Sequence, residues 1–328
     1  AGYDTIGTAD VAGKNVSLGR IEAAGAYITA TGAILDGNGS ATNIIATWLG
    51  GPVIQLRSKG GGSAGSLAIS ADTATGGTIT ATVDSGATYG GIDLRNTSLV
   101  QPTSVDLTDN ATSGSAIFSQ NFTSPTATLS DAGIAVVARP GGFVGLSSNR
   151  DLSFGGTGFF TAGGGGQIGF AANNGILSID SVLAGGTDSV ELSAGTLNIA
   201  QPVSGVNITL DGSTMNVNAA TTATGLLDVF GGTVNVNAAM QGQNVFLGAN
   251  TLNIGKLGGT GGINATNHML AVVTGDTNIT GGYLTTVGGD LELLVGGDLK
   301  VGNASHGGMI HAGMTKMTPY FPDASIAD

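Results

Sequence analysis

The chain has 328 residues, of which 59 are Gly, 7 are Pro and none is Cys. The Gly content is far above the usual ~7%, but the low Pro content and the lack of a three-residue period exclude collagen. Charged residues are 10% and apolar residues 41%, which excludes an acidic disordered tail. The net charge of −12 argues against nucleic-acid binding through phosphates. No apolar run is long enough to predict a membrane-spanning helix.

Strand-like segments begin close to the N-terminus. Apolar residues alternate with Ser and Thr at residues 15–19 and 26–30, and a turn signal follows at Asp36-Gly37-Asn38-Gly39. Residues 96–131 are the least periodic part and are rich in Thr, Ser and Pro. We expect longer loops there, or an excursion from a regular stack.

The most regular part of the chain is residues 189–302. A five-residue phrase with Asn between two apolar residues starts at Gly195 and returns after 18, 19 and 18 residues. Repetition at about 20 residues indicates a solenoid. Apolar pairs continue this pattern from Leu152/Phe154 to Leu299/Val301 at intervals of 18–25 residues.

These intervals predict an all-β parallel β-helix of roughly 15 coils over residues 1–302. A coil with two or three short strands buries its apolar face only by stacking on the next coil. We therefore expect an inner ladder formed by Leu197, Met215, Val234 and Leu252. An outer ladder, with amides bonded along the stack, is expected from Asn198, Asn216, Asn235 and Asn253.

Residues 303–328 break the rhythm, with Tyr320 and Phe321 between two prolines. This segment is interpreted as a cap or linker, or alternatively as an arm that docks on a neighbouring molecule. In the second interpretation, Tyr320 and Phe321 are the candidates for self-association. Open ends of a β-helix expose strand edges, which favours end-to-end assembly into filaments.

Polar residues give little sign of chemistry. A β-helix enzyme needs acidic or basic residues that converge on one groove, but the arginines at 57, 95, 139 and 150, four of the five in the chain, are scattered. Acids gather only at Asp290, Glu292 and Asp298. We expect no catalytic residue and no cofactor. Calcium in the turns at Gly289-Asp290 and Gly297-Asp298 stays open as an alternative to ordinary turn aspartates.

Two stretches resemble a known family. The second stretch, residues 288–301, contains the sequence GGDL twice, starting at positions 288 and 296. This stretch and residues 16–39 are similar to repeats of filamentous-haemagglutinin-type bacterial exoproteins. The resemblance implies a right-handed parallel β-helix at the cell surface, exported by two-partner secretion or as an autotransporter passenger. The NPNG-type motif of the family's secretion domain does not occur, so we interpret the chain as a piece of a longer polypeptide.

The function expected from these observations is structural. We predict an extracellular, non-enzymatic protein of a bacterial surface that acts in adhesion, aggregation, or filament and biofilm matrix formation through homotypic contacts. Host or matrix glycans are further expected partners. The alternative is a carbohydrate-active β-helix enzyme or a polysaccharide binder resembling a phage tailspike.

Overall fold

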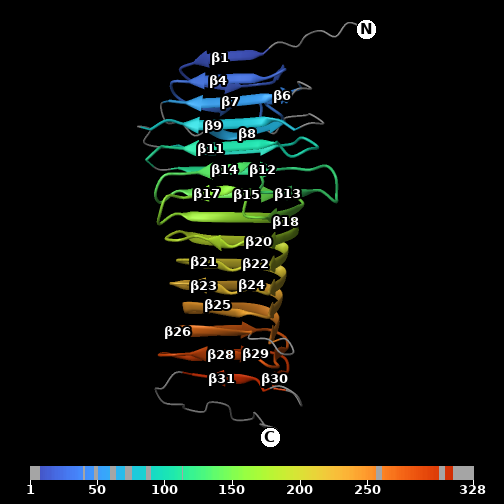
Figure 1. Ribbon diagram of the computed structural model, residues 1–328, viewed down its shortest axis with the longest axis vertical. Helices are drawn as coiled ribbons and strands as arrows, with labels where there is room; N and C mark the ends of the chain where they lie inside the picture. Colours follow the sequence, from blue (N-terminus) through green and yellow to red (C-terminus); the bar gives the residue numbers. More distant parts are fainter. Residues whose placement is uncertain are drawn as a thin grey trace.

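The computed structural model describes residues 8–39, 41–47, 51–59, 64–70, 76–85, 90–112, 114–255, 261–302 and 307–312. Its strands lie one above another along the long axis of the molecule, broadly in the order of the sequence (Figure 1). The described residues contain no helix, and so none that is long and apolar enough to cross a membrane. The chain is an all-β protein.

The N-terminal half carries a first side made of one seven-stranded sheet. Apolar and polar residues alternate along most of these strands, so that one face of the sheet enters the core. Each strand pairs in parallel with the corresponding strand of the next coil. The strands are β1 (Ala9–Gly13), β4 (Ala26–Ala30), β7 (Val53–Ser58), β9 (Thr78–Val83), β11 (Ser104–Asp109), β14 (Ile134–Val137) and β17 (Phe159–Thr161).

A second side runs through the whole stack. Its first strands are β3 (Ile21–Ala23), β6 (Ile44–Ala46), β8 (Ala64–Ser70), β10 (Ile92–Asn96), β12 (Ser115–Gln120) and β15 (Phe143–Ser148). Longer strands follow, namely β18 (Gln167–Ile179), β20 (Ser189–Ile199), β22 (Ile208–Val217), β24 (Leu226–Val236), β25 (Ala239–Ile254), β26 (Gly262–Val273) and then the short β29 (Leu291–Val295).

The long strands continue from the second side onto a third side of the stack. The first half of β18 pairs with β15 and its second half with β16, so this strand spans two sides. The other strands of the third side are β13 (Thr128–Ser130), β16 (Asp151–Phe154), β27 (Thr277–Ile279) and β30 (Leu299–Val301).

The remaining strands are short. In the C-terminal coils, β19 (Leu183–Ala184), β21 (Val203–Gly205), β23 (Thr221–Ala223), β28 (Tyr283–Thr286) and β31 (Met309–His311) pair with one another or with the beginnings of β25 and β26. Near the N-terminus, β2 (Val16–Leu18) pairs with β5 (Ile34–Asp36). The described strands pair in parallel, coil upon coil, which confirms the predicted parallel β-helix.

The core consists of rows of apolar side chains that run along the stack. Leu197 lies opposite Met215, Met215 opposite Val234, and Val234 opposite Leu252, as the repeat predicts. All four side chains are fully buried. Burial of each such side chain contributes about 1.5–3 kcal/mol, so successive coils stabilise one another.

Several coils in the N-terminal half are longer than the predicted 18–25 residues. Ile54, Ile79, Val105 and Ile134 occupy one inward row of the first side, and they follow one another after 25, 26 and 29 residues. The additional residues lie between strands. Insertions between strands leave the pairing intact, because only the strands must match from coil to coil.

Residues 96–131 do not leave the stack. They contain β11, β12 and β13, each paired with strands of neighbouring coils. Their periodicity is weak because inward positions hold polar side chains: Asn96 lies opposite Gln120, both are buried, and Nδ2 of Asn96 donates a hydrogen bond of 2.7 Å to Oε1 of Gln120. Buried amides are tolerated where they are paired in this way.

Strand pairing continues beyond Gly302, where the sequence pattern ends. In β31, Met309, Ile310 and His311 pair with Tyr283, Leu284 and Thr285 of β28. Residues 307–312 therefore belong to the stack. Most of the segment 303–328, including Tyr320 and Phe321, lies outside the described residues.

Candidate functional site

The outer asparagine ladder is present on the third side. Asn198, Asn216, Asn235 and Asn253 lie in register. From Asn216 onward, each Nδ2 donates a hydrogen bond of 2.8–2.9 Å to Oδ1 of the asparagine in the preceding coil. All four side chains are partly buried. These amides are largely used by one another, so the ladder is part of the scaffold.

The row of this ladder extends in both directions beyond the predicted members. Asn278 continues it and donates a hydrogen bond of 2.9 Å to Asn253. Lys300 follows Asn278 in the last coil of this row. On the N-terminal side, Ser178 and Ser153 occupy the same row. The sequence indicates this position of Asn278, because Asn278 lies between Thr277 and Ile279, which align with the apolar pairs of the preceding repeats.

Asp290, Glu292 and Asp298, the acids that gather near the C-terminal end, are all exposed. Asp290 is exposed and its Oδ2 lies 3.9 Å from Nδ1 of the exposed His268. The N–H of Asp298 donates a hydrogen bond of 2.9 Å to Oδ1 of Asp276, which is the ordinary role of an aspartate in a turn. Within the described residues, no three His, Asp or Glu side chains gather as ligands for a metal ion.

Among the described residues, the last core positions at the C-terminal end of the stack are exposed. In the row of Leu197, residues Leu252 and Thr277 are fully buried, whereas Leu299 is 42% exposed. In the neighbouring row, Ile254 and Ile279 are fully buried and Val301 is 46% exposed. Among described strands, β30 pairs only with β27. Within the described residues, the inner rows therefore end at β30 in exposed apolar side chains, which we call the open end. Figure 1 labels β30 in the last coil of the stack.

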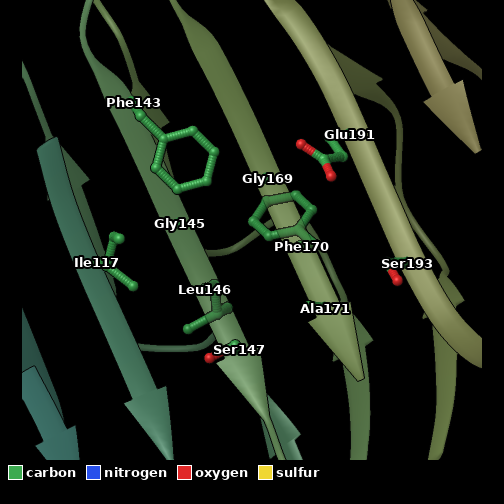
Figure 2. Close-up of a pocket in the computed structure, with 10 residues that line it drawn as sticks. All are labelled: Ile117, Phe143, Gly145, Leu146, Ser147, Gly169, Phe170, Ala171, Glu191 and Ser193. Atoms are coloured by element: carbon green, nitrogen blue, oxygen red, sulfur yellow. The ribbon is translucent and has the colours of Figure 1, made fainter. Parts of the chain in front are cut away.

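A second surface lies on the outer face of the second side, around Phe143. The ring of Phe143 covers Gly145 in its own strand and Gly169 in the next. A Cβ atom placed on either glycine would lie 2.8 Å from a carbon of this ring. The ring thus occupies the space of two missing side chains. Figure 2 shows it lying broadly along the strands, with one face toward the viewer.

A shallow hollow of ≈ 120 Å³ lies beside this ring. Glu191 is next to Gly169 in register and stands at one end of the hollow, with Ile117 at the other (Figure 2). Nε2 of Gln167 donates a hydrogen bond to Oε2 of Glu191. The other lining residues are Leu146, Ser147, Phe170, Ala171 and Ser193. We call this surface the Phe143 platform.

A glycine-rich corner adjoins the platform on its other side. The hollow there has a volume of ≈ 430 Å³ and shares Phe143 with the first, and its remaining lining is Gly114, Gly141, Gly142, Gly165, Gly166, Gln167 and Ser189. A Cβ atom on Gly142 would lie 2.8 Å from the carbonyl oxygen of Gly114, and one on Gly166 would lie 2.3 Å from that of Gly142. The close stacking of these coils therefore requires glycine.

Buried aspartates, among them Asp188 and Asp109, hold corners of the stack in place. Asp188 accepts hydrogen bonds from the N–H groups of Ala162 and Gly166. Asp109 accepts one of 2.9 Å from the N–H of Ala111, while its Oδ2 has no hydrogen-bond partner among the described residues. Burial raises the pKa of Asp109, against the opposing effects of this hydrogen bond and of Arg139.

The sequence did not single out Phe143, Gly169 or Glu191. Alternation places Phe143 outward, because Val144 and Leu146 of the same strand are buried. Its meeting with Gly169 and Glu191 depends on pairing between coils of unequal length, which alternation does not show. No protein-family model, no curated protein and no solved structure matches this chain. The resemblance to filamentous-haemagglutinin-type exoproteins stays a prediction.

Proposed function

We propose that the chain is a structural, adhesive rod of a bacterial surface that joins end to end with copies of itself outside the cell. Its role in this proposal is mechanical rather than catalytic. A stiff stack presents its sides to other surfaces, while its ends extend the rod into filaments or matrix. The resemblance to secreted adhesin repeats supports the location and the adhesive role.

The observation that carries the proposal is the open end. Leu299 and Val301 belong to rows that are otherwise fully buried, and they are exposed by 42% and 46%. Each row is a template for one more coil, because a strand edge and an apolar face end together there. Covering these side chains with another coil removes apolar area from water at ~25 cal/mol per Å².

The opposite end offers a complementary edge. Strand β1 is the terminal strand of the first sheet and pairs only with β4 among the described strands. A contact between the β1 end of one copy and the open end of another joins two different surfaces. Contacts of this heterologous kind generate open filaments when the rotation does not close a ring.

Electron microscopy and sedimentation of the full chain test this proposal. We expect rods longer than one molecule, whose length increases with protein concentration. Leu299→Lys and Val301→Lys place a charge on the open end and are expected to give single rods. The matched control is Val182→Lys, because Val182 is 57% exposed between β18 and β19, away from this end.

Two results would overturn the proposal. One is a wild-type chain that stays as single particles at all concentrations. The other is filament formation that survives both end substitutions unchanged. Circular dichroism of every variant checks that the strand content is retained, so that loss of assembly is not mistaken for loss of the fold.

A further inference from the structure

We infer that the Phe143 platform is a binding site for uncharged sugars, and that it takes a pyranose ring of a neutral glycan. This inference deepens the adhesive part of the proposed function and rests on it. The platform lies on the flank of the stack rather than at its ends, so binding and end-to-end assembly are separable by experiment.

The flat aromatic surface is the first element of the site. One face of the Phe143 ring covers Gly145 and Gly169, and the ring is only partly buried. An aromatic face carries partial negative charge. The C–H groups on one face of a pyranose carry partial positive charge and are nearly coplanar, so a sugar ring stacks on such a surface. The two glycines keep the ring flat, because any side chain there would displace it.

Polar groups around the ring supply the second element. Glu191 and Gln167 form a hydrogen-bonded pair beside the ring, and Ser147 and Ser193 line the same hollow. Oγ of Ser147 donates a hydrogen bond of 2.7 Å to Oγ of Ser119 and keeps its own lone pairs. A carboxylate accepts up to about four hydrogen bonds, so Glu191 has capacity left for sugar hydroxyls.

Charge decides which glycans fit. The residues lining the two hollows include one carboxylate and no Lys or Arg, and the whole chain has a net charge of −12. A uronic or sulfated sugar would bring a second negative charge against Glu191, which is unfavourable. Neutral hexoses and acetylated amino sugars bring hydroxyl and amide groups without this cost.

The length of the surface indicates an oligosaccharide rather than a single sugar. The polar glycine-rich corner continues from the far side of Phe143, which lines both hollows. A ligand that stacks on Phe143 therefore extends to either side, onto the corner or toward Glu191. Ligand sites are lined mainly by apolar and aromatic side chains with a few polar groups that fix orientation, and the lining of the platform has this composition.

Titration calorimetry of the full chain with a panel of soluble oligosaccharides tests the inference. The panel contains neutral hexaoses of glucose and mannose, chitohexaose, oligogalacturonate as the anionic member, and oligolysine as a cationic peptide. We expect a neutral oligosaccharide to bind and the oligogalacturonate and oligolysine not to bind. Phe143→Ala is expected to weaken binding about tenfold, which corresponds to about 1.4 kcal/mol.

Three further variants separate binding from folding. Phe143→Trp keeps an aromatic surface and is expected to retain binding, and Glu191→Gln removes the charge and weakens it severalfold. Phe159→Ala is the matched control, because Phe159 is 60% exposed in β17 and lies outside the platform. Melting temperatures of all variants are measured beside the titrations, so that the Trp and Gln variants decide the question if the Ala variant unfolds.

The inference is overturned if no neutral oligosaccharide of the panel binds, or if Phe143→Ala binds as wild type does. It is equally overturned if oligogalacturonate or oligolysine is the preferred ligand. Any of these results, together with intact filament formation, leaves the proposed end-to-end assembly standing. Sugar binding by a chain that never assembles overturns the assembly proposal and not the site.

Discussion

Nδ2 of Asn235 donates a hydrogen bond of 2.9 Å to Oδ1 of Asn216, its partner in the preceding coil. Asn253 donates to Asn235 in the same way, also at 2.9 Å. The amides therefore all point in one direction along the stack, and aligned hydrogen bonds of this kind polarise and strengthen one another. A slip of one residue in any coil would turn its asparagine toward the core. The ladder thus helps to fix the register of the coils.

Replacing Asn235 with Ala removes two bonds of this ladder. We expect the free energy of unfolding to fall by about 1 kcal/mol, since water partly replaces the lost partners at a half-buried site. Asn237→Ala is the control, because it removes a single exposed bond of 2.8 Å to Asn218 and should cost less. Urea denaturation of both variants measures the difference. An equal effect of the two would show that the ladder adds nothing beyond an ordinary surface amide.

Thr277 is a weak point of the inner row that leads to the open end. It is fully buried between Leu252 and Leu299, and its Oγ1 has no hydrogen-bond partner among the described residues. Thr277→Val keeps the shape and removes the buried hydroxyl, so we expect stabilisation by about 1 kcal/mol. The midpoint of urea denaturation checks this. Thr277→Ser, which keeps the hydroxyl and loses a methyl group, should destabilise; a lower midpoint for the Val variant contradicts the prediction.

Gly166 is required by the distance between coils and not by its backbone angle. A Cβ atom there would lie 2.3 Å from the carbonyl oxygen of Gly142 and 2.5 Å from Cβ of Ala162. We expect Gly166→Ala to destabilise the protein by on the order of 2 kcal/mol. Gly19→Ala is the matched control, because a Cβ atom on Gly19 meets nothing within 4 Å. Thermal denaturation should separate the two variants; similar melting temperatures would mean that the corner relaxes freely.

The buried carboxyl of Asp109 makes stability depend on pH. Because burial raises the pKa of Asp109 in the folded protein above its ordinary value of 3.8, the fold binds this proton more tightly than the unfolded chain does. The corresponding stabilisation is present below pH 3.8 and is lost as the pH rises through the raised pKa. The pKa values of Asp93 and Asp228 are also raised by burial and act in the same direction.

Asp109→Asn removes the charge and keeps the oxygen that accepts from the N–H of Ala111. We expect the variant to be more stable than wild type at pH 7 and to lose this advantage toward pH 4. Thermal denaturation at several pH values measures the difference. The control is Asp290→Asn, because the Asp290 side chain is 91% exposed. A constant difference between wild type and Asp109→Asn across the pH range would contradict the prediction.

The sequence by itself determined the repeating core and the outer ladder. Leu197 and Asn198 are read as inward and outward because strand residues alternate, and they align with Met215 and Asn216 because the phrase returns after 18 residues. When similar five-residue phrases stack, their inward residues are buried and their outward asparagines pair from coil to coil. This follows from the repeat without knowledge of the residues that connect one phrase to the next. The inner and outer rows over residues 189–302 could therefore be predicted residue by residue.

Only the tertiary structure decided where unequal coils meet. Asn96 and Gln120 are buried together although neither is apolar, and the sequence suggested loops at these positions. Phe143, Gly169 and Glu191 come from three successive coils whose lengths differ. Alternation orients each side chain inward or outward, but which of them become neighbours depends on the residues inserted between strands. The scaffold is thus repetitive and readable from the sequence, whereas the Phe143 platform arises from coils of unequal length, since only their long-range pairing brings its residues together.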